Sequence, residues 1–277
     1  MKAKNRTKNR AGFNPASMFY ACLVYLFLYI PIIVVIVFSF NTSKINIKFD
    51  GFTAEWYLRM FNNTTLMESF QNTLIVAAAS TAISIVIGTL CAVGLSRFEF
   101  KLKGLITNSL YIPIAIPEIV FGIALLVFFS SIELKTGMLT LILSHVTFSM
   151  PFVAITVRSR IAGFDRSIEE AARDLGANEF RTFMRVTLPI IMPGVIAGGM
   201  LALTLSLDDV VISFFTSGPG STTLPLKILG MVKKGVSPDV NALSTLVILG
   251  TVAIMAISHS AQSRLEKKQG GNNSKIK

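Results

Sequence analysis

Long apolar runs separated by short polar segments dominate this chain. A helix that crosses a bilayer needs about 20 apolar residues, and six stretches reach that length. They run roughly over 18–40, 69–96, 105–131, 137–157, 188–215 and 241–261. The second begins with polar residues, so its membrane portion is expected at 74–95. The pattern therefore predicts an all-α integral membrane protein with six transmembrane helices.

Positive charge is unevenly shared among the polar segments. With the N-terminus inside, the inside segments 1–17, 96–104, 158–187 and 262–277 hold 19 of the 26 Lys and Arg residues. Cytoplasmic loops collect Lys and Arg, so the asymmetry supports six spans with both termini cytoplasmic. The composition, 52% hydrophobic and 15% charged, also favours a membrane protein. The net charge of +11 is then explained without nucleic acid.

Three parts follow from this pattern. A basic cytoplasmic N-terminus covers 1–17, a transmembrane domain covers 18–262, and a polar cytoplasmic tail covers 263–277. The apolar run behind the basic start has no small-residue cleavage site, so we expect a retained first helix and not a cleaved signal peptide. The two cysteines lie in apolar runs, which argues against a disulfide scaffold.

Several of the predicted spans contain prolines. Pro113 and Pro117 lie in the third, and Pro189 and Pro193 lie in the fifth. Each proline removes a helix hydrogen bond that lipid cannot replace, so these sites must be covered by protein or line a cavity. Ordinary helix packing and helices that bend around a passage both remain open.

The inside segment 158–187 has a helical pattern of its own. Ser167 and Glu170 fit a capping box. Gly176 fits a helix C-terminus, where a left-handed residue is needed, and Asn178 can cap a second helix. The segment is predicted to form a helix, a tight turn and a second helix, each about two turns long.

One face of the first short helix is apolar. Its members are Ile168, Ala171, Ala172 and Leu175. Such a face suits a helix that lies on lipid headgroups, and it equally suits docking into a groove of a partner protein. The residues alone leave both possibilities open.

The same loop resembles the EAA motif of bacterial ABC importer permeases. That pattern is Glu-Ala-Ala, three residues, Gly, nine residues and Ile-x-Leu-Pro. Here it is EAA at 170–172, Gly176 and Val186-x-Leu188-Pro189, and only Val186 departs from it. The stretches EAARDLGANEF and LTLSLDDVVISFF, among others, resemble the PotC-type permeases of spermidine/putrescine importers. This similarity runs over most of 18–262.

The resemblance implies a MetI-like permease fold in the bacterial inner membrane, with a coupling loop at about 165–189. The coupling residues it implies are Glu170, Ala171, Ala172, Asp174, Gly176, Leu188 and Pro189. The implied partners are a related PotB-like permease, two copies of a cytoplasmic PotA-like ABC ATPase, an extracytoplasmic PotD-like polyamine-binding protein, and membrane lipid. The chain has no GxxxxGK[ST] phosphate loop. We therefore expect a transport subunit that is not an enzyme and holds no cofactor, with ATP and Mg bound by the ATPase.

Acidic residues within the apolar runs are the candidates for handling a cationic cargo. Glu118 lies near the middle of the third span, and Asp208 and Asp209 lie in the fifth. Carboxylates are costly in lipid and usually face a cavity, and a polyamine needs negative charge along its path. Ser206 would add a polar group beside them. Helix-to-helix hydrogen bonds, or protonation in place, are the alternatives.

Two further side chains stand out. Trp56, the single tryptophan, lies in the first outside loop and is either an interfacial anchor or a substrate contact near an outer gate. His145 lies in the fourth span, where we expect a hydrogen bond in helix packing and no metal site.

Three rival functions remain. A secondary transporter could use Glu118 or Asp208 as a proton relay, although a coupling loop argues against it. A membrane enzyme such as an intramembrane protease would need a nucleophile and base, and no such motif is present. The same permease machinery could import another solute, such as an amino acid or a metal chelate.

Overall fold

The computed structural model describes residues 15–43, 48–165, 167–234, 238–253 and 256. The helices are α1 (Pro15–Phe38), α2 (Glu55–Phe61), α3 (Thr64–Arg97), α4 (Lys103–Ser109), α5 (Ile112–Ala115), α6 (Glu118–Ser131), α7 (Met138–Ala162), α8 (Ser167–Asp174), α9 (Glu179–Thr182), the π-helix η1 (Phe183–Thr187), α10 (Leu188–Leu207), α11 (Val211–Thr216), α12 (Leu224–Lys234) and a last helix, Pro238–Ala253. Across these ranges the one β-type pairing is an isolated bridge between Asn41 and Phe52. The predicted all-α class is confirmed, whereas the N-terminal segment and the tail lie almost entirely outside the described residues.

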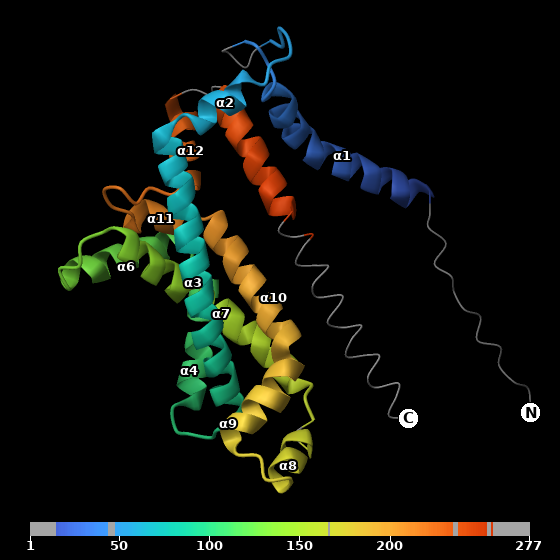
Figure 1. Cartoon of the computed structure of the whole chain (residues 1–277), viewed down its shortest axis with the longest axis vertical. Coiled ribbons are helices and arrows are strands. Elements are labelled where there is room, and N and C mark those ends of the chain that lie inside the picture. Colours follow the sequence, from blue (N-terminus) through green and yellow to red (C-terminus); the bar gives the residue numbers. More distant parts are fainter. Residues whose placement is uncertain (1–14, 44–47, 166, 235–237, 254–255, 257–277) are drawn as a thin grey trace, which may run out of the picture.

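Helices α3, α7 and α10 form the centre of the molecule (Figure 1). They pack closely because glycines face Val153 of α7 from both neighbours. A Cβ added at Gly88 of α3 would lie 2.8 Å from Val153 Cβ, and one added at Gly198 of α10 would lie 3.1 Å from Val153 Cα. Small residues at helix crossings let backbones approach in lipid. The three helices therefore form one tightly packed unit.

Four helices in the described part of the chain are long and apolar enough to cross a membrane. They are α1, α3, α7 and the helix that runs through α9, η1 and α10. A bent pair of helices makes a possible fifth span, and the last helix, Pro238–Ala253, is a shorter apolar helix. The predicted count of six spans stays a prediction, because most of 254–261 lies outside the described residues.

The third predicted span, 105–131, is not one straight helix. It consists of two arms, Lys103–Ala115 and Glu118–Ser131, bent by 113°. The cause lies in Pro117, which has no N–H to donate and disfavours helical geometry in the residue before it. Ile116 accordingly has an extended backbone, with φ −81° and ψ 134°. Of the two possibilities that the prolines left open, this span therefore has the bent helix.

The fifth predicted span, 188–215, is broken near its end. Helix α10 stops at Leu207, and α11 begins at Val211 after a short break that holds Asp208 and Asp209. Helix α11 packs against α6, the second arm of the bent span. The packing is close at Gly122, where an added Cβ would lie 2.8 Å from the Phe215 ring. Two broken spans thus meet beside the central helices (Figure 1).

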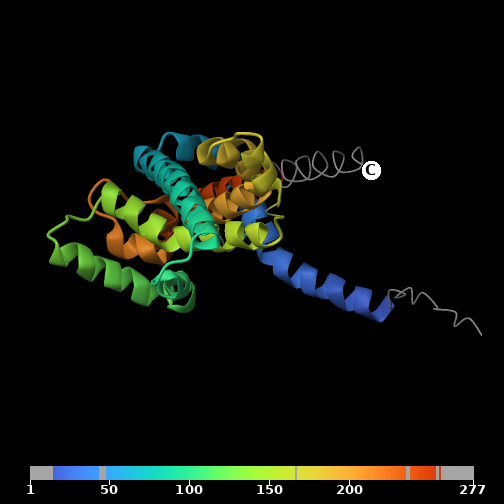
Figure 2. The same cartoon turned by 90° about the horizontal axis from the view of Figure 1, so that it is seen from below.

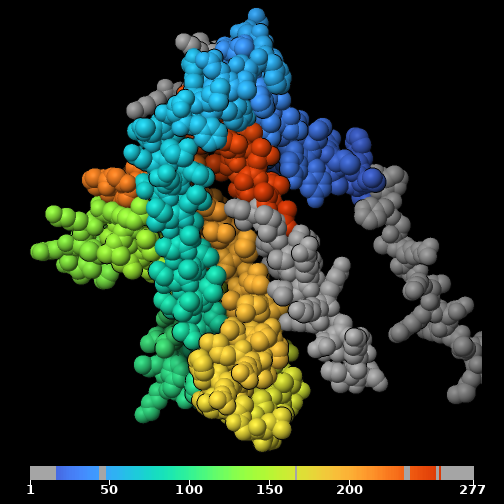
Figure 3. Space-filling model, in the orientation of Figure 1, coloured from blue at the N-terminus to red at the C-terminus, as the bar shows by residue number. Residues whose placement is uncertain are grey.

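The two ends of the long axis carry different elements (Figure 1). Helices α8 and α9 lie at one end, whereas α2 and α12 lie at the other, where α2, α3, α12 and the last helix share a cluster of Met60, Leu66, Leu224 and Leu243. Helix α1 leans away from the body in both views and in the space-filling picture (Figures 2 and 3). None of its apolar window is buried. Its surface therefore faces lipid or another protein.

Candidate functional site

Three sequence-predicted acids come together where the two broken spans meet. Glu118 is the first residue of α6, directly after the bend, and Asp208 and Asp209 occupy the break between α10 and α11. Because α6 packs against α11, the charges of both aspartates act on the Glu118 carboxyl. The fold thus brings together, at two helix breaks, residues that are far apart in sequence.

The two aspartates have different surroundings although they are consecutive. The Asp209 side chain is 7% exposed. Its carboxylate accepts hydrogen bonds from the backbone N–H groups of Ile212, at 3.2 Å, and Ser213, at 2.7 Å. These bonds satisfy donors at the start of α11 that have no partner within the helix. Asp208, by contrast, is exposed, as is Glu118.

A buried polar network lies behind Asp209. His145 of α7 hydrogen-bonds through Nδ1 with Ser206 Oγ at 2.7 Å and through Nε2 with Ser213 Oγ at 3.1 Å. Ser206 also hydrogen-bonds with Ser80 of α3 at 3.1 Å. The network joins α3, α7, α10 and α11. The predicted packing role of His145 is confirmed. The hydroxyl of Ser206 forms its hydrogen bonds within this network, and the residue is buried.

Trp56 lies apart from the acids, on α2 at one end of the molecule (Figure 1). It is 7% exposed, and its indole Nε1 donates a hydrogen bond to the backbone carbonyl of Asn41 at 2.6 Å. The Arg59 guanidinium lies 5.0 Å from the centre of its ring. In this arrangement Trp56 ties α2 to the segment that follows α1. The described chain does not bring it to the acidic cluster.

The predicted turn in the loop 158–187 is confirmed. Gly176 has φ +85°, the left-handed conformation that favours glycine. The N–H of Gly176 donates to the Arg173 carbonyl at 2.8 Å, and that of Ala177 donates to the Ala172 carbonyl at 3.1 Å. This pair of bonds is a Schellman motif, which satisfies carbonyls at the end of α8. Asn178 then caps α9 by accepting from the Arg181 N–H at 2.9 Å, as predicted.

The beginning of the loop helix differs from the predicted capping box. Helix α8 already includes Ser167, and the carboxylate of Asp165 accepts a hydrogen bond from the Ser167 N–H at 3.0 Å. Hydrogen bonds from the backbone and side chain of Ser167 hold the pKa of Asp165 below its usual value. Asp165 therefore stays ionised at neutral pH, and its negative charge lies at the N-terminus of α8, where the helix dipole favours it.

The second loop helix is not separate from the membrane span, contrary to the prediction. Helix α9 runs through η1 into α10 and forms one 29-residue helix, Glu179–Leu207. The π-helical turn ends at Thr187, just before Pro189. In a regular helix the proline ring would clash with the carbonyl four residues earlier, and a wider π turn relieves that crowding. Proline here marks a bulge and not the start of a span.

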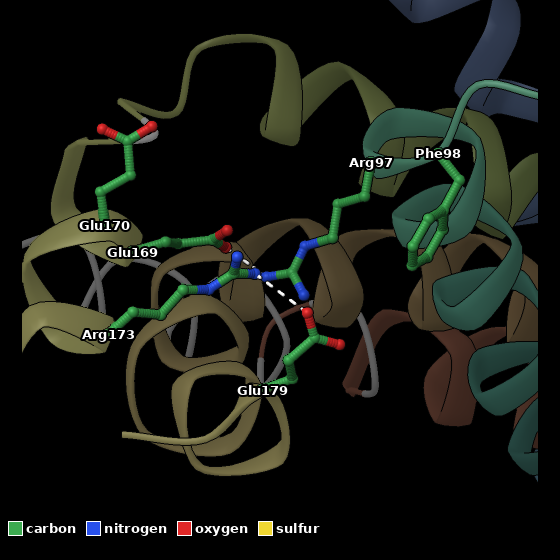
Figure 4. A pocket seen from close by; sticks show the side chains of 6 residues that line it. All are labelled: Arg97, Phe98, Glu169, Glu170, Arg173 and Glu179. Atoms are coloured by element: carbon green, nitrogen blue, oxygen red, sulfur yellow. Dashed lines mark hydrogen bonds and ion pairs between the residues drawn. The ribbon is translucent and has the colours of Figure 1, made fainter. Parts of the chain in front are cut away.

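A cleft lined mainly by charged side chains lies on the exposed surface of this loop (Figure 4). It is lined by Arg97, Phe98, Glu169, Glu170, Arg173 and Glu179. Of the sequence-predicted coupling residues, Glu170, Ala171, Asp174 and Gly176 are exposed here. Apolar side chains are exposed beside them, with Leu175 89% and Phe180 68% accessible. The loop thus presents both charge and apolar surface outward.

The sequence analysis missed Arg97, Glu169 and Thr187, which bond to one another beneath the cleft. Glu169 directly precedes the EAA motif. Composition does not tell which of the two adjacent glutamates is buried. A weak signal existed in spacing. Helix positions 169 and 173 share one face and 170 and 174 the next, so the two glutamates had to point in different directions.

Comparison with known proteins gives a consistent result. Residues 84–270 match the family described as binding-protein-dependent transport system inner membrane component. The chain is 45% identical over 263 residues to the spermidine/putrescine transport system permease protein PotC of Shigella flexneri, covering 95% of this chain and 97% of that protein. It is 40% identical over 255 residues to the putrescine transport system permease protein PotI of Escherichia coli K12, covering 89% and 90%.

Solved structures agree on the fold. A bacterial ABC transporter that imports the acidic polysaccharide alginate matches with a TM-score of 0.71 at 15% identity. The match covers 94% of this chain and 99% of that one. At this identity the likeness concerns the fold alone, which is that of an all-helical ABC permease.

Proposed function

The chain belongs to the family of binding-protein-dependent transport system inner membrane components, and from this premise we propose that it is the permease that forms half of the passage of an ATP-driven importer of spermidine and putrescine. The observation that carries the proposal is the 45% identity to a spermidine/putrescine permease along nearly the whole of both chains. The predicted family resemblance is thereby confirmed. The acidic cluster supplies the chemistry that such a cargo requires.

Polyamines are flexible polycations, so their path needs negative charge within the membrane. Charged side chains at this depth are costly and mark pathways for ions and substrates. Glu118 and Asp208 are exposed at two helix breaks, and broken helices at membrane depth are tolerated where they line a cavity. We assign charge compensation to these two carboxylates. Asp209 has a supporting role, because its carboxylate oxygens accept hydrogen bonds from the start of α11.

The inside loop is proposed to dock on a cytoplasmic ATPase, one copy on this permease and a second on a related partner permease. Its exposed apolar residues Leu175 and Phe180 suit a partner's groove, and Glu170 and Asp174 add charge at the rim. ATP and Mg are bound by the ATPase and not by this chain. An extracytoplasmic binding protein would deliver the polyamine to the outer loops, and both termini of the permease would be cytoplasmic.

The proposed cycle is alternating access. Closure of the ATPase around ATP moves the docked loop, and the continuous helix from α9 to α10 carries that motion into the membrane. The break between α10 and α11, which contains Asp208 and Asp209, lies at the far end of the same helix. Opening to the outside then admits the polyamine from its binding protein, and hydrolysis resets the inward-facing state.

The test is uptake of labelled spermidine into proteoliposomes that contain this chain, its partner permease, the ATPase and the binding protein, with and without ATP. We expect uptake only with ATP. ATP-dependent uptake of a different solute, with none of spermidine or putrescine, would keep the family assignment and overturn the cargo. Uptake that follows a proton gradient and ignores ATP would overturn the coupling mechanism and favour a secondary transporter.

A further inference from the structure

Two neighbouring glutamates of α8 face in opposite directions. Glu170, the glutamate of the EAA motif, is exposed, whereas the preceding Glu169 is 9% exposed. Figure 4 shows Glu169 extending toward Arg97 while Glu170 points away from it. The motif glutamate is therefore available to a partner, and its neighbour is committed to contacts within the chain.

Glu169 belongs to a closed triangle of hydrogen bonds. Arg97 Nη2 donates to Glu169 Oε1 and to Thr187 Oγ1, the latter at 2.7 Å, and Thr187 Oγ1 donates to Glu169 Oε1 as well. The Arg97 guanidinium also lies 5.9 Å from the centre of the Phe183 ring. Thr187 is 2% exposed. Hydrogen bonds to ionised partners are roughly twice as strong as neutral ones, so this is a firm junction.

The triangle joins three elements, of which α3 is far from the other two in sequence. Arg97 is the last residue of α3, Glu169 lies in α8, and Thr187 ends η1 directly before α10. From this point α3 and α10 run side by side through the centre of the molecule, where they pack on α7. The triangle therefore connects α8 directly to α3 as well as to the start of α10.

We propose that Arg97 and Glu169 are positioning residues that couple the docking helix α8 to α3 and α10 together. The inference rests on the proposed function, in which the loop docks on an ATPase. Without the triangle, α8 remains attached to the helix that continues into α10 through the turn at Gly176 and through the ion pair between Arg173 Nη2 and Glu179 Oε1, at 3.5 Å, but it loses its charged link to α3. ATPase motion would then be absorbed in the loop before it reached α3.

The experiment uses the complete transporter in proteoliposomes with spermidine-loaded binding protein. Arg97→Gln and Glu169→Gln should still co-purify with the ATPase and retain basal ATP hydrolysis. Stimulation of hydrolysis by the binding protein, and the spermidine imported per ATP, should each fall about fivefold or more, as expected for a lost charge-assisted hydrogen bond. Arg97→Lys, which keeps the charge, should recover most of both. Unchanged coupling in Arg97→Gln would overturn the inference.

Two further variants guard against misfolding and against non-specific charge effects. Thr187→Val has nearly the same shape as the native residue and removes only the hydroxyl, so it should fold and lower the coupling ratio about threefold. Coupling equal to wild type in Thr187→Val would count against the triangle. The matched control is Lys103→Gln, which removes an ion pair with the exposed Glu99 near the same end of α3. It should leave the coupling ratio unchanged, and an equal loss there would also overturn the inference.

A measurement that does not depend on the cargo separates this inference from the proposed function. If spermidine-loaded binding protein does not stimulate ATP hydrolysis by the wild-type transporter, the proposal of spermidine as the cargo is wrong. Hydrogen–deuterium exchange on the purified assembly still tests the triangle, because Arg97→Gln should speed exchange of the α8 amides while Lys103→Gln does not. Equal α8 exchange in wild type and Arg97→Gln would show that Glu169 needs no tie to α3.

Discussion

The carboxylate of Asp209 lies 3.4 Å from Nε2 of His145, and both side chains are almost completely buried. Asp208, the residue before it, is exposed. Consecutive residues on a helix point about 100° apart, and the break in the helix at this point separates the pair further. One acid therefore maintains the junction between α10, α11 and α7, and the other is exposed.

Replacing Asp208 with asparagine should impair transport and spare assembly. The substitution keeps the shape of the side chain and removes an exposed negative charge. It leaves the hydrogen bonds at the start of α11 in place, because Asp209 accepts them. We expect the initial rate of spermidine uptake to fall about tenfold or more, the scale of one lost charge–charge contact in a pathway. Uptake in proteoliposomes and co-purification of the ATPase measure the two properties. Uptake at the wild-type rate would assign Asp208 a structural role.

Asp209→Asn should act mainly on stability, with Asp208→Asn as its matched control. The variant loses the ionised acceptor for the Ile212 and Ser213 amides and the pairing with His145. We expect a loss of about 1–3 kcal/mol, typical of a hydrogen bond to a charged group. Thermal unfolding of the purified permease should show a lower Tm for this variant than for the control. Equal Tm values would argue against the buried network as a stabilising junction.

Gly176→Leu should prevent docking of the ATPase through backbone strain. Steric crowding is not the reason, because a Cβ at Gly176 meets no atom within 4 Å. The cost arises because φ is +85°, where a non-glycine residue loses about 1–2 kcal/mol. The turn should shift, and ATPase co-purification should drop. Gly176→Asn, which tolerates this conformation better, is the control and should retain the partner. Equal recovery of the ATPase by both variants would contradict the prediction.

Local patterns were sufficient to predict the elements whose causes are local. A run of about 20 apolar residues indicates a span because lipid offers no partner to a broken backbone, and α1, α3 and α7 follow this rule. Gly176 and Asn178 indicated the turn because each supplies a geometry or an acceptor that few residues can. These predictions needed no knowledge of distant parts of the chain.

Features that depend on contacts between distant segments were not predictable in the same way. Pro117 indicated an irregularity, but the sequence alone showed neither the angle of 113° between the two arms nor the packing of α6 against α11. The apolar pattern predicts that the fifth span begins at 188, next to Pro189, whereas the preceding π turn lets the helix continue through this proline. The link from Glu169 to Arg97 joins separate segments, so no spacing rule could reveal it. The same holds for His145 and its two serines.

The close contact between α3 and α7 can be tested by replacing glycine with alanine at two sites of α3, one at the contact and one away from it. Gly88→Ala places a methyl group 2.8 Å from Val153 Cβ and 3.0 Å from the Met150 carbonyl oxygen. Neither atom can move without a shift of α7, and overpacking of this kind costs about 1–3 kcal/mol.

Gly94→Ala, two turns further along α3, meets no atom within 4 Å. It should be neutral or stabilising, since alanine favours a helix over glycine by about 1 kcal/mol. Thermal unfolding of the two purified variants gives the comparison, and spermidine uptake gives its functional counterpart. We expect a lower Tm and reduced uptake only for Gly88→Ala, because separating α3 from α7 also displaces the Arg97 end of α3 from α8. If the two variants unfold alike, the close approach at Val153 does not hold the central helices together.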